Sequence, residues 1–182
     1  MLSNRRLPIV AAVLLLFAAV AVLLARTNRS ADRSFRQFAV EIDTARVTAV
    51  TIEWPDNDTV LNLNHRATGW VVTVPTGDMA ANSQQVDELL ACLSAVEVVR
   101  QMTNSSAVWP RYGVAADSST HITIRSQKRI LADFYCGRAE VDAQKGRIWT
   151  FVRNANEPAV YMTDGYLNML VNREFATWVI MY

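Results

Sequence analysis

The chain has 182 residues, with 18 lysines and arginines against 17 aspartates and glutamates, and its formal net charge is +1. Residues 1–36 contain six arginines and one aspartate, a charge of +5 that leaves −4 on the remainder. Nucleic-acid-binding domains normally present a basic patch, so a mildly acidic body without a run of basic residues argues against that class. Residues 37–182 are enough for one domain of ordinary size.

An uninterrupted apolar run covers residues 7–25 and contains no charged side chain. At about 1.5 Å of rise per residue, a helix of this length matches the hydrocarbon core of a bilayer. We therefore expect an N-terminal single transmembrane helix that acts as an uncleaved signal-anchor. A cleaved signal peptide is the alternative, because Arg5 and Arg6 supply a basic start. The small-x-small triplet at residues 19–21, however, would place cleavage inside the apolar run.

These features predict four segments along the chain. Residues 1–6 form a short basic tail, residues 7–25 the transmembrane helix, residues 26–45 a juxtamembrane linker and residues 46–182 an extracytoplasmic domain. A short tail is readily retained in the cytoplasm while a large domain is translocated. The expected location is thus the inner (cytoplasmic) membrane, crossed once, with the N-terminus inside and a periplasmic C-terminal domain.

The domain is expected to be rich in β-strands. Apolar and polar residues alternate in seven stretches, which is typical of half-buried strands. The turn residues between neighbouring stretches favour antiparallel hairpins. The predicted strands are residues 46–54, 59–64, 69–74, 121–125, 130–136, 147–153 and 159–163.

Two stretches instead have the spacing of a helix. Asn82 or Ser83 can cap a helix that continues to about Arg100 and buries one apolar face. A short helix follows Asp164, and the apolar C-terminal segment should dock on the domain. The predicted fold class is therefore α+β: an N-terminal transmembrane helix followed by a mainly antiparallel β domain in two β-rich halves, each ending in a helix.

The order of these landmarks resembles the domain of unknown function 4340 family over about residues 46–182. The resemblance lies in the hairpin that ends in Gly69-Trp70-Val71-Val72, the helix SQQVDELLACLSAVEV, the tetrad Arg111-Tyr112-Gly113-Val114 and the later VYMTDGYLNMLV. It implies an extracytoplasmic β-rich module on a membrane protein, associated with ABC-type transport systems or gliding-motility components. It supplies no catalytic residues.

A search for catalytic chemistry finds no nucleophile elbow, no phosphate-binding glycine loop and no metal-ligand spacing around His65 or His121. We expect no cofactor and no metal. The best carboxylate group is Asp133, Glu140 and Asp142, whose simplest interpretation is a solvated hairpin face. As an active site, these acids could serve a membrane-tethered envelope hydrolase.

The two cysteines, Cys92 and Cys136, leave two alternatives open. In an oxidising compartment they could form a disulfide. As residues of apolar faces, they could equally be buried core thiols.

Aromatic residues suggest a contact surface. Tyr135, Trp149 and Phe151 lie opposite the aliphatic faces of their strands, and such side chains are enriched in interfaces. The expected function is that of a non-enzymatic membrane-anchored accessory or assembly protein that binds other envelope proteins, such as an ABC-type transporter complex, and no nucleic acid. A small-ligand or peptide binding module is the alternative.

Overall fold

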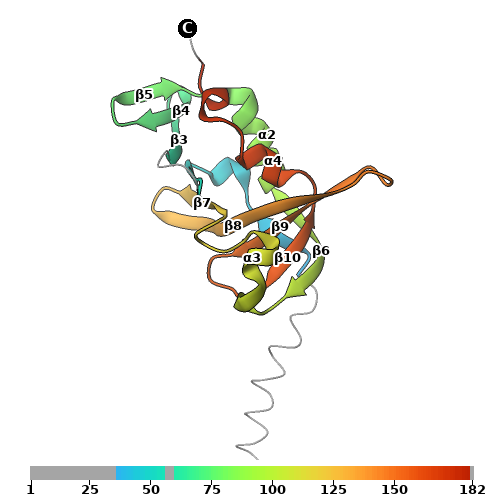
Figure 1. Ribbon diagram of the computed structural model, residues 1–182. Coiled ribbons are helices and arrows are strands. Elements are labelled where there is room, and N and C mark those ends of the chain that lie inside the picture. Colours follow the sequence, from blue (N-terminus) through green and yellow to red (C-terminus); the bar gives the residue numbers. More distant parts are fainter. Residues whose placement is uncertain (1–35, 56–59, 181–182) are drawn as a thin grey trace, which may run out of the picture. The chain divides into compact units, whose positions relative to one another are not determined.

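The computed structural model describes residues 36–55 and 60–180, and one sheet dominates them (Figure 1). Ten strands pair in the order β1-β6-β10-β9-β8-β7-β2-β3-β4-β5, and every pair is antiparallel. The strands are β1 (Phe38–Glu41), β2 (Ala49–Glu53), β3 (Val60–Arg66), β4 (Gly69–Val74), β5 (Gly77–Ala80), β6 (Ala95–Thr103), β7 (Thr120–Ser126), β8 (Arg129–Asp142), β9 (Arg147–Asn154) and β10 (Val160–Asp164).

The helices are short. The α-helices are α2 (Ser83–Leu93), α3 (Trp109–Tyr112) and α4 (Leu167–Val171), and the 3-10 turns are η1 (Thr44–Arg46), η2 (Ser106–Val108) and η3 (Phe175–Trp178). Helices α2 and α4 contact each other and lie above β8 in Figure 1, whereas α3 lies below it.

The face of the sheet under α2 and α4 holds the main core, and we call it the helix face. Alternate residues of the strands point to it, as the period-2 pattern predicted. Its fully buried side chains come from strands and helices alike: Ile52, Leu61, Leu63, Val72, Leu89, Leu93, Ile122, Ile124, Phe134, Val152, Leu167, Leu170 and Trp178. The predicted docking of the C-terminal segment is confirmed, because Trp178 is buried and Val179 pairs with Ala81.

The opposite face, which we call the α3 face, carries a second and smaller cluster under the segment that contains α3. This cluster consists of Tyr112, Val114, Phe151, Val160 and Met162. Among the described residues, this cluster adds a second covering over β9 and β10, and Met102 of β6 packs against it.

The predicted fold class is wrong in its division into two β-rich halves that each end in a helix. The first helix ends at Leu93, and the residues from 95 to about 100, which were expected to continue it, belong to β6. Strand β6 pairs with both β1 and β10, so it ties the two ends of the chain into one continuous sheet. Its β-branched residues Val96, Val98 and Val99 suit a pleated surface better than a helix.

The expectation of a transmembrane, signal-anchored membrane protein also needs correction. Within residues 36–55 and 60–180, no helix combines the length and apolar character that crossing a bilayer requires. The apolar run at residues 7–25, where that helix was expected, lies outside the described residues. Strand β1 and the first two residues of η1 fall in the segment expected to be a linker, and the compact unit begins at Gln37.

Candidate partner-binding surface

The three aromatic residues expected to form a partner surface do share the α3 face. Tyr135 is paired with Arg153, and Phe151 and Trp149 follow at two-residue steps along β9. Phe151, however, is only 1% exposed, and its ring meets Tyr112 edge-on at 4.9 Å between centroids. The chain's own α3 segment covers this position, so the aromatic trio cannot act as one exposed docking patch.

The tetrad Arg111-Tyr112-Gly113-Val114 makes this covering possible. Gly113 ends α3 in the left-handed conformation, with φ of 66°, and lies against β8. A β-carbon on Gly137 of β8 would collide with the carbonyl oxygen of Tyr112 and lie 2.6 Å from Val114 Cγ1. Two glycines therefore let the α3 segment and β8 approach backbone to backbone. The role of the tetrad is structural.

Arg153 is the buried cation of the α3 face, at 3% exposed. Its guanidinium lies 3.9 Å from the ring centroid of Trp109 and 4.2 Å from that of Tyr135. Its Nε donates to the carbonyl oxygen of Val114 at 3.0 Å. Burial lowers the pKa of this guanidinium, and Tyr135 opposes that change. The arginine thus joins α3 to the sheet through two aromatic faces and a carbonyl group.

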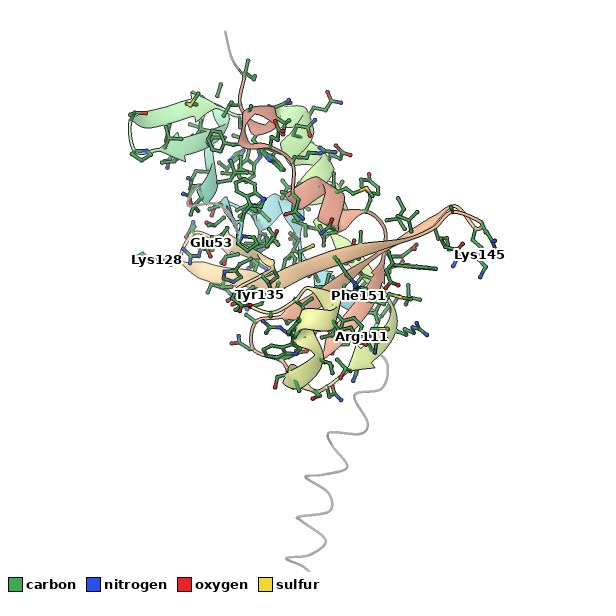
Figure 2. The ribbon with its side chains drawn as sticks, viewed as in Figure 1. Glu53, Arg111, Lys128, Tyr135, Lys145 and Phe151 are labelled. Atoms are coloured by element: carbon green, nitrogen blue, oxygen red, sulfur yellow. The ribbon has the colours of Figure 1, made fainter. Side chains whose placement is uncertain are left out.

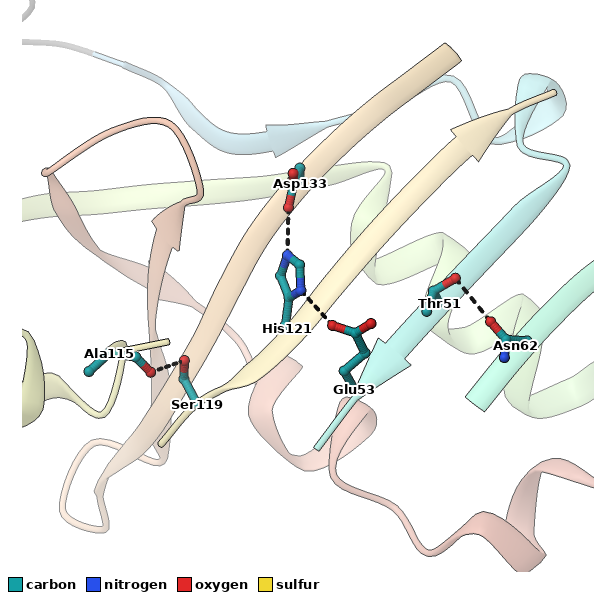
Figure 3. Close-up of polar contacts among 7 residues, drawn as sticks. All are labelled: Thr51, Glu53, Asn62, Ala115, Ser119, His121 and Asp133. Carbon is teal, nitrogen blue, oxygen red and sulfur yellow. Dashed lines mark hydrogen bonds and ion pairs between the residues drawn. The ribbon is translucent and has the colours of Figure 1, made fainter. Parts of the chain in front are cut away.

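Beyond Tyr135 the same face becomes polar and open to solvent. His121 stacks on the Tyr135 ring, with 4.6 Å between centroids and 17° between planes. Its Nδ1 lies 2.8 Å from Glu53 Oε2, and its Nε2 lies 2.7 Å from Asp133 Oδ1 (Figure 3). Strand register puts Glu53, His121, Tyr135 and Arg153 directly opposite one another on β2, β7, β8 and β9. We call the group formed by Glu53, His121 and Asp133 the histidine clamp.

The three acids considered for hydrolysis are not gathered into one site. Asp133 contacts His121, Glu140 pairs with Arg138 at 3.3 Å, and Asp142 caps the β8–β9 turn. Glu140 lies seven positions after Asp133 along β8, which is about 20 Å at the usual rise. The carboxylates of a glycosidase pair lie much closer, at roughly 5–10 Å. Among the described residues, no group of three histidines, cysteines or acids could hold a metal ion.

Both cysteines are free thiols, and both contribute to the main core. Burial raises the pKa of Cys136, with a smaller contribution from neighbouring Cys92. Burial also raises the pKa of Cys92, and the charge of Glu88 adds to this. The structure therefore favours the core-thiol alternative over the disulfide.

An open cleft of about 290 Å³ lies where the α3 segment, β8 and α4 meet. Its polar lining is largely bonded to itself. Asn168 Nδ2 donates to the carbonyl oxygen of Gly137 at 2.6 Å, and Asn172 Nδ2 donates to that of Asn168 at 3.0 Å. Thr120 donates its hydroxyl to Asn172. Arg138 is the charged residue of the lining.

Several exposed apolar side chains lie on the β8–β9 hairpin and at the start of α4. The hairpin runs past the last β9–β10 pair, Trp149 and Asp164, and projects from the sheet to its tip at Lys145 (Figures 1 and 2). Val141, at 61% exposed, is paired with Ile148 on the helix face. The carbonyl oxygen of Ile148 accepts from the N–H of Gly165, the residue before Tyr166, and the Tyr166 hydroxyl donates to Glu88 Oε1 of α2 at 3.5 Å.

We define the arm surface as Val141, Ile148, Tyr166 and Met169. Tyr166 is 44% and Met169 47% exposed, and both belong to the segment that begins α4. This surface was not predicted from the sequence, because the hairpin was expected to present a solvated acidic face. Val141 and Ile148 were the apolar residues that could have indicated it. Their exposure, however, depends on β10 ending at Asp164, which the local sequence does not reveal.

These features define a class of protein built on one antiparallel sheet, with a polar cluster and an aromatic cluster on one face and the main core on the other. A family model described as Domain of unknown function (DUF4340) matches residues 70–180, and the chain belongs to this family. The resemblance seen in the sequence is thereby confirmed over those residues. No curated protein and no solved structure matches the chain.

Proposed function

We propose that the chain is a non-enzymatic accessory or assembly protein whose sheet domain works outside the cytoplasm and binds another protein through the arm surface. The expected partner is a component of an ABC-type transport complex, as the family resemblance implies. The observation that supports the proposal is the exposed apolar surface on a projecting hairpin. No catalytic residue or cofactor has a part in it.

The geometry of the arm suits a contact with a partner. A two-stranded ribbon is only marginally stable by itself in water, so apolar side chains on it gain from being covered. Covering apolar area is favourable by about 25 cal/mol per Å². The exposed Val141 is also flanked by charges of both signs, on Arg138, Glu140, Asp142, Lys145 and Arg147. An apolar centre with a polar rim is the usual composition of a protein–protein interface.

Site-specific photo-crosslinking in cells tests the proposal. A photoreactive residue at position 141 of the full-length chain should give an adduct that contains a transport-complex component. The matched control is position 128, an exposed lysine just before the other end of β8 (Figure 2). Adducts from both positions alike, or an absence of adducts from position 141, would contradict binding through the arm.

The small-ligand or peptide alternative has one observation in its favour, the cleft beside Gly137 and Asn168. Its volume of about 290 Å³ is at the lower end of ligand-binding pockets. Arg138 is the charged residue of the lining, and its exposed pair with Glu140 at 3.3 Å would have to exchange for a ligand's carboxylate or phosphate. Chemical-shift mapping with short acidic peptides would decide, since only true binding would move the Asn168 and Asn172 amide signals and be lost in Arg138→Gln.

A further inference from the structure

The hydrogen-bond geometry of the histidine clamp indicates the protonation state of its imidazole ring. The two ring nitrogens of His121 each face a carboxylate oxygen, at 2.8 Å from Glu53 and 2.7 Å from Asp133. A neutral imidazole has one N–H donor and one acceptor nitrogen, so it can donate to only one ionised carboxylate. Only an imidazolium donates to both. The geometry therefore corresponds to the protonated ring.

The surroundings of His121 include both anionic and cationic groups. Two carboxylates contact the ring directly, from β2 and β8, and His121 is 25% exposed at its side chain. On the far side of the Tyr135 ring lies the Arg153 guanidinium of β9, and Arg125 lies four residues along β7. Burial lowers the pKa of His121, but hydrogen bonds to Asp133 and Glu53 and their charges outweigh burial and raise it above 6.5.

We propose that the histidine clamp is a proton-dependent latch at the junction of β2 and β7. The sheet order makes this junction the place where strands β2–β5 join strands β7–β10. Protonated His121 ties β2 to β8 across β7, and loss of the proton removes one of its two charged hydrogen bonds and leaves a nitrogen lone pair facing a carboxylate. The sheet is thus held most firmly at this junction at acidic to neutral pH.

The direction of the pH effect follows from linkage. The folded state binds the His121 proton more tightly than the unfolded chain, whose histidines have a pKa near 6.5. The latch therefore contributes its full stabilisation below pH 6.5. That contribution is lost as the pH rises through the raised pKa of the folded state.

The first experiment compares thermal unfolding of the full-length wild type and His121→Gln at about pH 6 and about pH 9, on either side of an ordinary histidine pKa. Glutamine keeps a donor and an acceptor but cannot take up a proton. At the lower pH, we expect the wild type to unfold at a temperature a few degrees above that of His121→Gln. At the higher pH, this difference should disappear. His65→Gln is the matched control, since His65 contacts Trp70 edge-on, at 5.1 Å between ring centroids. A gap of equal size at both pH values for His121→Gln would overturn the latch.

A second measurement does not depend on a destabilised variant folding well. In the His65→Gln background, the imidazole C–H signal of His121 is the single histidine signal of the chain, and its NMR titration gives the midpoint directly. We expect a midpoint above 6.5 that falls in Asp133→Asn and in Glu53→Gln. A wild-type His121 that is already neutral at pH 6.5 would refute the proposal.

Discussion

The two faces of the central sheet use alternate residues of the same strands in different ways. On the helix face, Ile122 and Phe134 are completely buried in an aliphatic and aromatic core. On the α3 face, their neighbours His121 and Tyr135 stack on each other and belong to a row of cations, rings and carboxylates. Each strand therefore contributes both to non-directional packing and to directional polar contacts.

The two faces should therefore differ in which substitutions destabilise the fold. Apolar packing depends mainly on volume, so the helix face should respond most to cavities. The contacts of the α3 face depend on register and on close backbone approach, so it should respond to shape and charge. Substitutions on each face test this contrast.

Phe134→Ala should be the most destabilising of the changes considered, with a loss of about 3–5 kcal/mol in the free energy of unfolding. Phe134 is completely buried and pairs with Ile122 on the helix face, so its removal leaves a cavity. Chemical denaturation measures the loss. Ile130→Ala is the control on the same strand, because Ile130 is half exposed and should cost about 0.5 kcal/mol or less. Similar losses for both would show that this face is not the principal core.

Gly137→Ala should cost about 3 kcal/mol, because overpacking against backbone cannot be relieved by a side-chain rotation. The new β-carbon would meet the carbonyl of Tyr112 and the side chain of Val114. Gly146→Ala is the matched control: nothing lies within 4 Å of its β-carbon, although its φ of +61° still disfavours alanine. It should cost about 1 kcal/mol. The predicted contrast fails if the two variants unfold at the same denaturant concentration.

Arg153→Lys should cost about 2 kcal/mol, since an ammonium group can neither stack between two rings nor reproduce the guanidinium's donors. The contacts at risk are those with Trp109, Tyr135 and the carbonyl oxygen of Val114. Equilibrium unfolding followed by tryptophan fluorescence gives the value. Arg147→Lys, on the exposed end of β9, should be neutral. Equal effects of the two substitutions would mean that the charge alone matters at position 153.

Val141→Ser should change stability by no more than about 0.5 kcal/mol while weakening partner capture through the arm surface. Val141 lies on the helix face of the sheet by register but is 61% exposed, so it contributes little to folding. Val152→Ala, buried on the same face, should instead cost roughly 2 kcal/mol. Co-purification of the crosslinked partner and thermal unfolding are measured together. A large stability loss for Val141→Ser would assign the arm to the core rather than to a binding surface.

Much of the sheet could be predicted from residue alternation. The stretches expected to be strands correspond to β2, β3, β4, β7, β8, β9 and β10, because their half-buried environment imposes a period of two. Strand β6 was missed because it follows α2 after Ser94, with no proline or glycine between the two. Its conformation depends on pairing with β1 and β10, which are distant in sequence. Strand β5 was missed because all of its residues are exposed and show no alternation.

The histidine clamp could not be predicted for a related reason. Glu53, His121 and Asp133 are polar residues on strands that were correctly expected, but their contact requires β2 and β7 to be neighbours in one register. Local sequence does not specify which strands are neighbours. The covering of Phe151 was missed in the same way, since it depends on where the α3 segment returns to the sheet.

The strand order has a consequence for how the chain acquires its structure. Strand β6 needs β10 as a neighbour, and β2 needs β7, so pairs such as Arg100 with Met162 and Val50 with Ile124 must close long loops before they stabilise anything. Proteins with such high contact order fold in milliseconds to seconds rather than microseconds. Until residues 160–164 leave the ribosome, one edge of β6 has no partner, and this valine-rich edge is open to misassembly with other nascent chains.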